Sequence, residues 1–170
     1  MSTRKGAYNE DFNTALQHLW GEGFLSPGGA DEVAAMLDGV QVEGLDVLDI
    51  GSGLGVCAVL MARQYGAANV LGVDVEPHLI DHSNERAAHA GLAEQVRFQL
   101  IEPGPLPMAD NQFDLVFTKD AIVHIPDKPA FYAEVLRVLE PGGSFVGSDW
   151  LRGGDETATE RALDWLEYVH

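Results

Sequence analysis

The segment 45–55, LDVLDIGSGLG, constrains the fold of this chain more than any other stretch of its sequence. It predicts a buried strand, a glycine-rich turn and the start of a helix, and the glycines let the turn approach a ligand closely. A second apolar run, 70–73, ends at Asp74. A carboxylate at this distance from the glycine turn binds the ribose of a nucleoside in doubly wound sheets. The two features together predict a nucleoside-binding α/β domain.

Short apolar runs alternate with longer helical stretches after residue 44. We expect strands at 45–50, 70–74, 96–100, 113–118 and 144–149, helices at 55–66, 77–90, 128–139 and 155–169, and two earlier helices at 10–20 and 30–39. The sequence EPGG at 140–143 predicts a turn before the last strand. This order predicts the α/β fold class, with a doubly wound, Rossmann-like parallel sheet of about five strands covered by helices on both faces.

The balance of charge narrows the range of partners. The 170 residues include 10 Lys and Arg against 27 Asp and Glu, a formal net charge of −17. A surface this acidic repels phosphates, so nucleic acid and acidic membranes are not expected as partners. Cys57 is the single cysteine, which excludes an internal disulfide, and no Cys/His cluster has the spacing of metal ligands. No apolar run approaches the ~20 residues of a membrane span and the N-terminus is polar, so we expect a cytoplasmic protein.

Two classes of cofactor could use the turn at 51–55. A dinucleotide site has its third glycine three residues after the second, whereas Gly55 follows Gly53 by two. Asp49 lies just before the turn, where a carboxylate would repel a pyrophosphate and suit a cation. The segment resembles motif I of the class I S-adenosylmethionine-dependent methyltransferases, whose cofactor carries an ammonium and a sulfonium. This resemblance implies that Asp49, Gly51 and Gly53 bind S-adenosylmethionine.

The exit of the third expected strand also resembles the class I pattern, from Phe98 through Glu102 to Asp110. In that family the position of Glu102 is usually an aspartate, which accepts a hydrogen bond from the adenine amino group. The next residue usually donates its backbone N–H to the ring, but here it is Pro103, which has no N–H. The resemblance therefore implies an adenine site with one backbone hydrogen bond fewer.

Two further segments give a narrower resemblance. WGEGFLSPGG at 20–29 and KDAIVHIPDK at 119–128 are similar to the phosphoethanolamine N-methyltransferases. Asp120 and His124 are four residues apart, so a helical turn after the fourth strand would place both on one face. In the family the histidine pairs with a tyrosine near the N-terminus that closes over the site, and Tyr8 stands at the matching place.

The match implies a role for each corresponding residue. Tyr8 and His124 form the catalytic pair, Trp150 and Tyr168 contact the substrate, and Lys119 stands where an arginine is also found. The implied cofactor contacts are Leu25, Ser26, Gly51, Asp74, Val75, Glu102, Pro103 and Asp120. We therefore predict a small-molecule N-methyltransferase in which the histidine accepts the amine proton or orders the amine. A helical lid would occupy 1–44, and the cofactor-binding domain 45–170.

The match stops near the end of the sequence. In the resembling family an arginine and a tyrosine follow the position of Tyr168 and a lysine comes much later, and these hold the substrate phosphate, but the sequence ends at His170 without them. The final antiparallel strand pair of the class I sheet is also missing from the expected elements. We expect a C-terminally truncated protein or one that a partner completes. Three functions stay open: phosphoethanolamine methylation, methylation of a glycine-like amine, or cofactor binding without catalysis.

The expected strand 144–149 lies at the edge of the sheet. It carries Phe145 and Val146, and an unpaired edge with apolar side chains favours association with another chain. We expect either a homo-oligomer that buries this edge or the helix 155–169 folded back over it.

Overall fold

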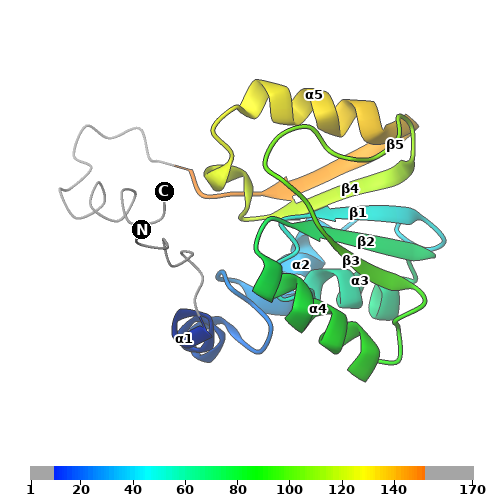
Figure 1. Cartoon of the computed structure of the whole chain (residues 1–170). Coiled ribbons are helices and arrows are strands. Elements are labelled where there is room, and N and C mark those ends of the chain that lie inside the picture. Colours follow the sequence, from blue (N-terminus) through cyan, green and yellow to red (C-terminus); the bar gives the residue numbers. More distant parts are fainter. Residues whose placement is uncertain (1–9, 152–170) are drawn as a thin grey trace.

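A computed structural model describes residues 10–151 of the chain (Figure 1). The elements are α1 (Glu10–Trp20), α2 (Gly29–Met36), β1 (Asp46–Ile50), α3 (Val56–Tyr65), β2 (Asn69–Asp74), α4 (Pro77–His89), β3 (Val96–Leu100), β4 (Phe113–Lys119), the 3-10 helix η1 (Ile122–His124), α5 (Lys128–Val138) and β5 (Leu139–Ser148). Tyr8, Tyr168 and the expected helix 155–169 lie outside the described residues. The strands and the helices between them confirm the predicted α/β fold.

The strands form one parallel sheet in the order β3-β2-β1-β4-β5. The chain order reverses at β1, because β2 and β3 lie on one side of it and β4 and β5 on the other. In doubly wound sheets, ligands bind beyond the carboxyl ends of the strands at this point of reversal. The carboxyl ends lie on the left in Figure 1, so the glycine turn after β1 occupies the place where this fold binds ligands.

Hydrophobic clusters fill the space on both sides of the sheet. Successive residues of β4 point to opposite faces: Leu115 and Phe117 join the cluster formed with α2, α3 and α4, and Val116 joins the cluster formed with α5. All three side chains are buried. Strands that are apolar on both faces need helices on both faces, which is the arrangement seen in Figure 1.

The N-terminal part of the chain packs into the same core as the sheet. Phe24, Val33, Leu37 and Val42 belong to the cluster under α3 and α4. The division of the chain at residue 44 into lid and domain stays a prediction. The packing shows that the loop between α1 and α2 is anchored, since core residues lie within and after it.

The last strand differs from its prediction. β5 begins at Leu139, before the expected start, because Leu139 already pairs with Phe113. The next pairing joins Leu115 to Ser144, so residues 140–143 leave the ladder as a bulge. The predicted turn at 140–143 is therefore a bulge within β5, and the Pro-Gly-Gly sequence serves to interrupt pairing and not to start the strand.

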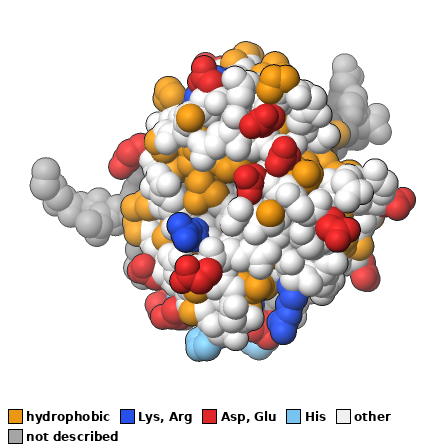
Figure 2. All heavy atoms as spheres, turned by 90° about the vertical axis from the view of Figure 1, so that its right-hand side faces the viewer, with side chains coloured by type: hydrophobic (Ala, Val, Ile, Leu, Met, Phe, Trp, Pro, Cys, Tyr) orange, Lys and Arg blue, Asp and Glu red, His pale blue; other side chains and the backbone are white. Residues whose placement is uncertain are grey.

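The two ends of the strands differ in character. Figure 2 shows the face where the strands begin, on which acidic side chains are scattered and few basic ones lie between them. Here the N–H of Asp46 donates to Oδ2 of Asp114 at 2.9 Å, and Nδ2 of Asn69 donates to Oδ1 of Asp46 at 2.7 Å, all in exposed positions. The predicted cofactor residues lie at the opposite, carboxyl edge.

Candidate functional site

The turn 51–55 leads from β1 into α3 at the carboxyl edge of the sheet. The N–H groups of Gly51 and Ser52 both donate to the carbonyl of Val73, at 2.9 and 3.0 Å, which ties the turn to β2. Gly51 has a φ of 74°, a conformation that a side chain would strain. A Cβ at this position would also overlap the Cβ of Ala121. Glycine is therefore required for the end of β4 to pack against the turn.

Asp74 ends β2 with a buried carboxylate that the backbone holds in one orientation. Its Oδ2 accepts from the N–H of Gly53 at 2.9 Å, and its Oδ1 accepts from the N–H of Glu76 at 3.0 Å. Each carboxylate oxygen has two lone pairs, so each keeps one acceptor position after these bonds. The carboxylate is thus fixed beside the glycine turn and can still accept from a diol.

Asp49 is the most deeply buried acid at this edge, with 2% of its surface exposed. Its Oδ2 has no hydrogen-bond partner among the described residues. Burial, with a smaller effect from the charge of Asp74, raises the pKa of Asp49 to about 7. A buried carboxylate oxygen without a hydrogen bond is costly unless a cation or donor reaches it, so this position fits an ammonium group.

The loop 21–29 between α1 and α2 lies next to the glycine turn. A Cβ on Gly53 would lie 3.4 Å from Cδ1 of Leu25. The Nζ of Lys119 donates to Oγ of Ser26 at 2.8 Å and to the carbonyl of Pro27 at 2.7 Å. The structure therefore brings two predicted cofactor contacts of the N-terminal part, Leu25 and Ser26, to the carboxyl edge.

Lys119 ends β4, and 4% of its side chain is exposed. Its Nζ lies 2.6 Å from Oδ2 of Asp120 and 2.7 Å from Oε2 of Glu32 in α2. Burial alone would lower the pKa of Lys119, but the hydrogen bonds to these carboxylates raise it above its ordinary value. The sequence indicated Lys119 only by its family position and gave no sign of Glu32. A lysine at the end of an apolar strand is the signal that could have indicated a buried ion pair.

The prediction that Asp120 and His124 lie on one helical face is wrong. The turn after β4 is a 3-10 helix that begins at Ile122, and Asp120 precedes it with a left-handed φ of 55°. Both residues still act on one neighbour. Burial raises the pKa of Asp149, the backbone N–H of Trp150 lowers it, and smaller effects come from the charges of Asp120 (raising) and His124 (lowering). Asp120 directly follows β4 and His124 ends η1, so the two residues reach the region of Asp149 without lying on one α-helix.

Three of the predicted cofactor contacts, Val75, Glu102 and Pro103, follow β2 and β3 and are exposed. The N–H of Ile101 donates to the carbonyl of Asp74 at 3.0 Å, so the ends of these two strands are joined. The position agrees with an adenine site, whose assignment stays a prediction. The substrate contacts and the catalytic pair also stay predictions. Trp150 is exposed, and Tyr8 and Tyr168 lie outside the described residues.

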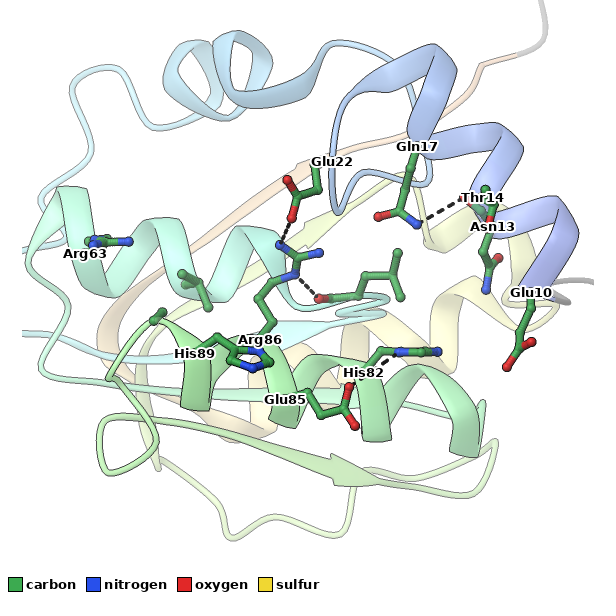
Figure 3. A pocket seen from close by; sticks show the side chains of 13 residues that line it. Glu10, Asn13, Thr14, Gln17, Glu22, Arg63, His82, Glu85, Arg86 and His89 are labelled. Atoms are coloured by element: carbon green, nitrogen blue, oxygen red, sulfur yellow. Dashed lines mark hydrogen bonds and ion pairs between the residues drawn. The ribbon is translucent and has the colours of Figure 1, made fainter.

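A groove of about 670 Å³ lies away from these residues, between α1, α3 and α4 (Figure 3). None of the predicted site residues within 10–151 lines it. Nε of Arg86 donates to the carbonyl of Leu54 at 2.9 Å, and its Nη1 lies 3.6 Å from Oε1 of Glu22. Leu54 belongs to the glycine turn and Glu22 to the loop 21–29. Arg86 therefore supports both segments from the side of α4, a contact that no local sequence pattern indicated.

Residues 10–151 contain no group of three or more His, Cys, Asp or Glu side chains arranged to hold a metal ion. Within the same part of the chain, no helix is long and apolar enough to cross a membrane. Cys57 is buried in the cluster under α3, and burial raises the pKa of its thiol, as expected for a small core residue.

The sequence is similar to known methyltransferases over most of its length. A family model described as a methyltransferase domain matches residues 41–164. Phosphoethanolamine N-methyltransferase 1 of Triticum aestivum is 33% identical over 147 residues, which cover 86% of this chain and 29% of that protein. Phosphoethanolamine N-methyltransferase 1 of Arabidopsis thaliana is 32% identical over 154 residues, which cover 90% of this chain and 30% of that protein. The chain spans about a third of the length of these curated relatives.

Solved structures show the same fold. Phosphoethanolamine N-methyltransferase 2 of Haemonchus contortus, in complex with S-adenosyl-L-methionine, matches with a TM-score of 0.88 and 28% identity, covering 97% of this chain and 38% of that chain. A Galdieria sulphuraria protein assigned as a sarcosine dimethylglycine methyltransferase matches with a TM-score of 0.72 and 26% identity, covering 82% of this chain and 60% of that chain. With the family model matching well over half of its residues, this chain belongs to the methyltransferase domain family.

Proposed function

We propose that this chain binds S-adenosylmethionine and transfers its methyl group to the nitrogen of a small amine. One observation carries the proposal: the carboxylate of Asp49 is buried just before the glycine turn, with an oxygen that lacks a hydrogen bond among the described residues. Asp74 is close enough for its charge to raise the pKa of Asp49. Two neighbouring carboxylates attract a cation and repel a phosphate. S-Adenosylmethionine carries an ammonium and a sulfonium, whereas a dinucleotide carries a pyrophosphate.

The residues present fit the parts of this cofactor. Asp49 would hold the ammonium, Asp74 the ribose hydroxyls and Glu102 the adenine amino group. The cofactor supplies an electrophilic methyl group on its sulfonium when bound. The protein orders the cofactor and acceptor in a closed site, which is the larger part of catalysis for such a displacement.

For the acceptor we favour phosphoethanolamine or a related amine. The support is the similarity to proteins named phosphoethanolamine N-methyltransferase, which covers most of this chain. Methylation of a glycine-like amine is the second candidate, because a protein assigned to sarcosine and dimethylglycine has the same fold. Both acceptors present an amine nitrogen that must lose its proton before it attacks.

His124 is our candidate for handling that proton, paired with Tyr8. It is exposed after β4 and lies near Asp149, whose pKa its charge affects. A histidine titrates near neutral pH and accepts a proton from an ammonium or orders the amine. His124→Ala and Tyr8→Phe are expected to lower the methyl-transfer rate by about 100-fold, the scale of general acid–base catalysis, with cofactor affinity unchanged. Transfer that survives both substitutions would contradict this role.

Calorimetry followed by a product assay tests the proposed function. The protein is titrated with S-adenosylmethionine and, separately, with NADH, and then incubated with phosphoethanolamine, ethanolamine, glycine and sarcosine. We expect the protein to bind S-adenosylmethionine and not NADH, and to form a methylated product from phosphoethanolamine. Tighter binding of NADH would contradict the assignment of the cofactor. Product from glycine or sarcosine, with none from phosphoethanolamine, would favour a glycine-like amine as the acceptor. Cofactor binding without product from any amine would identify a cofactor-binding protein without catalysis.

We also propose that a second copy of the chain covers the outer edge of β5. Within residues 10–151, β5 pairs with β4 on one side, and Phe145 is half-buried beside it. Its ring packs edge-on against Phe131 and Tyr132 of α5, at centroid distances of 6.3 and 6.0 Å. An unpaired edge next to such a cluster favours pairing with another chain. Light scattering at micromolar concentration is expected to give a dimer or larger species, and a monomer would contradict this.

A further inference from the structure

The loop 21–29 is attached to the sheet by basic side chains on both sides of the glycine turn. Arg86 of α4 contacts it through Glu22, and Lys119 of β4 contacts it through Ser26 and Pro27. The Lys119 side chain is the more buried of the two, with 4% exposed against 25% for Arg86. Lys119 is therefore the stronger candidate for fixing the loop.

The ammonium of Lys119 joins three separate parts of the chain. It lies within 2.8 Å of four oxygens: Oγ of Ser26, the carbonyl of Pro27, Oε2 of Glu32 and Oδ2 of Asp120. These belong to the loop, to α2 and to the residue after β4. If Lys119 served only to neutralise Asp120, its contact with Oδ2 of Asp120 would be sufficient. The additional contacts indicate that Lys119 sets the position of the loop and of α2 against β4.

Gly28 makes this arrangement possible. It has a φ of 87°, and a Cβ there would overlap Oε2 and Cβ of Glu32. A side chain at residue 28 would push the Glu32 carboxylate away from Lys119. The glycine thus leaves room for the ion pair that closes the loop.

We propose that Lys119 is a positioning residue, whose ammonium closes the loop 21–29 onto the end of β4 and holds Ser26 and Asp120 in place for the cofactor. The inference rests on the proposed function, since Ser26 and Asp120 are cofactor contacts within that proposal. An ion pair that holds ligand-contacting groups in advance raises affinity, because binding then costs less ordering of the protein.

Lys119→Met is the direct test, with Arg137→Met as the matched control. Arg137 also binds two carboxylates, at 2.7 and 2.8 Å, but far along the chain from the loop, on α5. Two quantities are measured: the affinity for S-adenosylhomocysteine, and hydrogen exchange of the cofactor-free protein at the amides of Phe24 and Glu32. These amides donate to the carbonyls of Gly21 and Gly28, at the two ends of the loop.

For Lys119→Met we expect about 10-fold weaker binding and about 10-fold faster exchange at both amides. Arg137→Met is expected to lower the melting temperature and leave both quantities unchanged. Lys119→Arg keeps the charge, so it is expected to fold, but a planar guanidinium cannot present one nitrogen to four oxygens. Its binding and exchange are expected to lie between those of the wild type and of Lys119→Met.

Wild-type binding and exchange in both Lys119 variants would overturn the inference. It would also be overturned if Lys119→Met failed to fold while Lys119→Arg matched the wild type, since Lys119 would then serve folding alone. A wild-type protein that does not bind S-adenosylhomocysteine would contradict the proposed function instead. The exchange measurement still tests the position of the loop in that case, because it uses the cofactor-free protein.

Discussion

Lys119 and Arg137 make the same kinds of contact, but their side chains differ in burial and in their place on the sheet. Each binds two carboxylates and at least one backbone carbonyl, and each holds a loop: 21–29 for Lys119, and 106–110 for Arg137. The Lys119 side chain is 4% exposed at the carboxyl edge of the sheet, whereas that of Arg137 is 28% exposed on α5.

The difference shows that location decides what an ion cluster does. The carboxyl edge that carries Lys119 also carries two further buried acids, Asp49 and Asp74, so this edge has an excess of negative charge. Around Arg137 the two acids, Asp110 and Glu134, both bind the guanidinium itself, which fastens the loop before β4 to α5. We therefore expect substitutions at the carboxyl edge to change ligand binding, and those around Arg137 to change stability and its dependence on acid pH without changing ligand binding.

The largest expected effect is the pH dependence caused by Asp49. Its pKa is about 7 in the folded protein and 3.8 when exposed, so between these values the folded state holds a proton that the unfolded chain has lost. The free energy of unfolding should therefore fall as pH rises from about 4 to 7, by an amount on the order of 4 kcal/mol. Asp49→Asn removes this contribution. Denaturant unfolding of both proteins across this range measures the difference, and parallel curves would contradict the prediction.

The next effect concerns Asp74. Asp74→Ala removes the acceptor proposed for the ribose and also the acceptor for the Gly53 N–H. Affinity for S-adenosylmethionine should weaken by about 1–3 kcal/mol. Asp110→Ala, which removes an acid from the Arg137 cluster, is the control and should bind like the wild type. Equal affinities for all three proteins, measured by calorimetry, would place the cofactor elsewhere.

Double-mutant cycles compare the two ion clusters directly. The pair Lys119–Glu32 should show a coupling energy of about 1–2 kcal/mol, because the Lys119 ammonium is buried and is poorly solvated when Glu32 is removed. The pair Arg137–Glu134, whose basic side chain is more exposed and which is spaced i,i+3 on one helix, should show about 0.3–0.5 kcal/mol. The variants Lys119→Met, Glu32→Gln, Arg137→Met and Glu134→Gln, with both double variants, are compared by thermal unfolding. A larger coupling at Arg137 would reverse the comparison.

The smallest effect is the acid response of Glu134. Its hydrogen bond to Arg137, with a smaller contribution from the N–H of Leu106, lowers its pKa, so the stability it contributes is present above its ordinary pKa and is lost as pH falls through the lowered one. This is the opposite sign to Asp49. Glu134→Gln should be less stable than the wild type at neutral pH, and the gap should close below about pH 4. A gap that stays constant with pH would contradict it.

The sequence predicted the features that depend on neighbouring residues. The run before Gly51, the glycine turn and the acid at the end of the next strand identified the fold and placed Asp49 and Asp74 at one edge. These signals survive in the structure because strand, turn and helix patterns are local. The predicted shared face of Asp120 and His124 failed for the same reason: a spacing of four implies a face only if the segment is an α-helix, and here it is not.

The sequence by itself determined the sheet, the position of the turn and the sign of the charge around it. Only the tertiary structure decided which charges are paired. Ser26 and Lys119 are 93 positions apart, and no periodicity connects them. The partners of Lys119 depend on how the loop 21–29 packs across the sheet, and the burial of Asp49 depends on the helices that cover it. Ion pairing and pKa are set by distances in space and by exclusion of water, which arise only when the whole chain has folded.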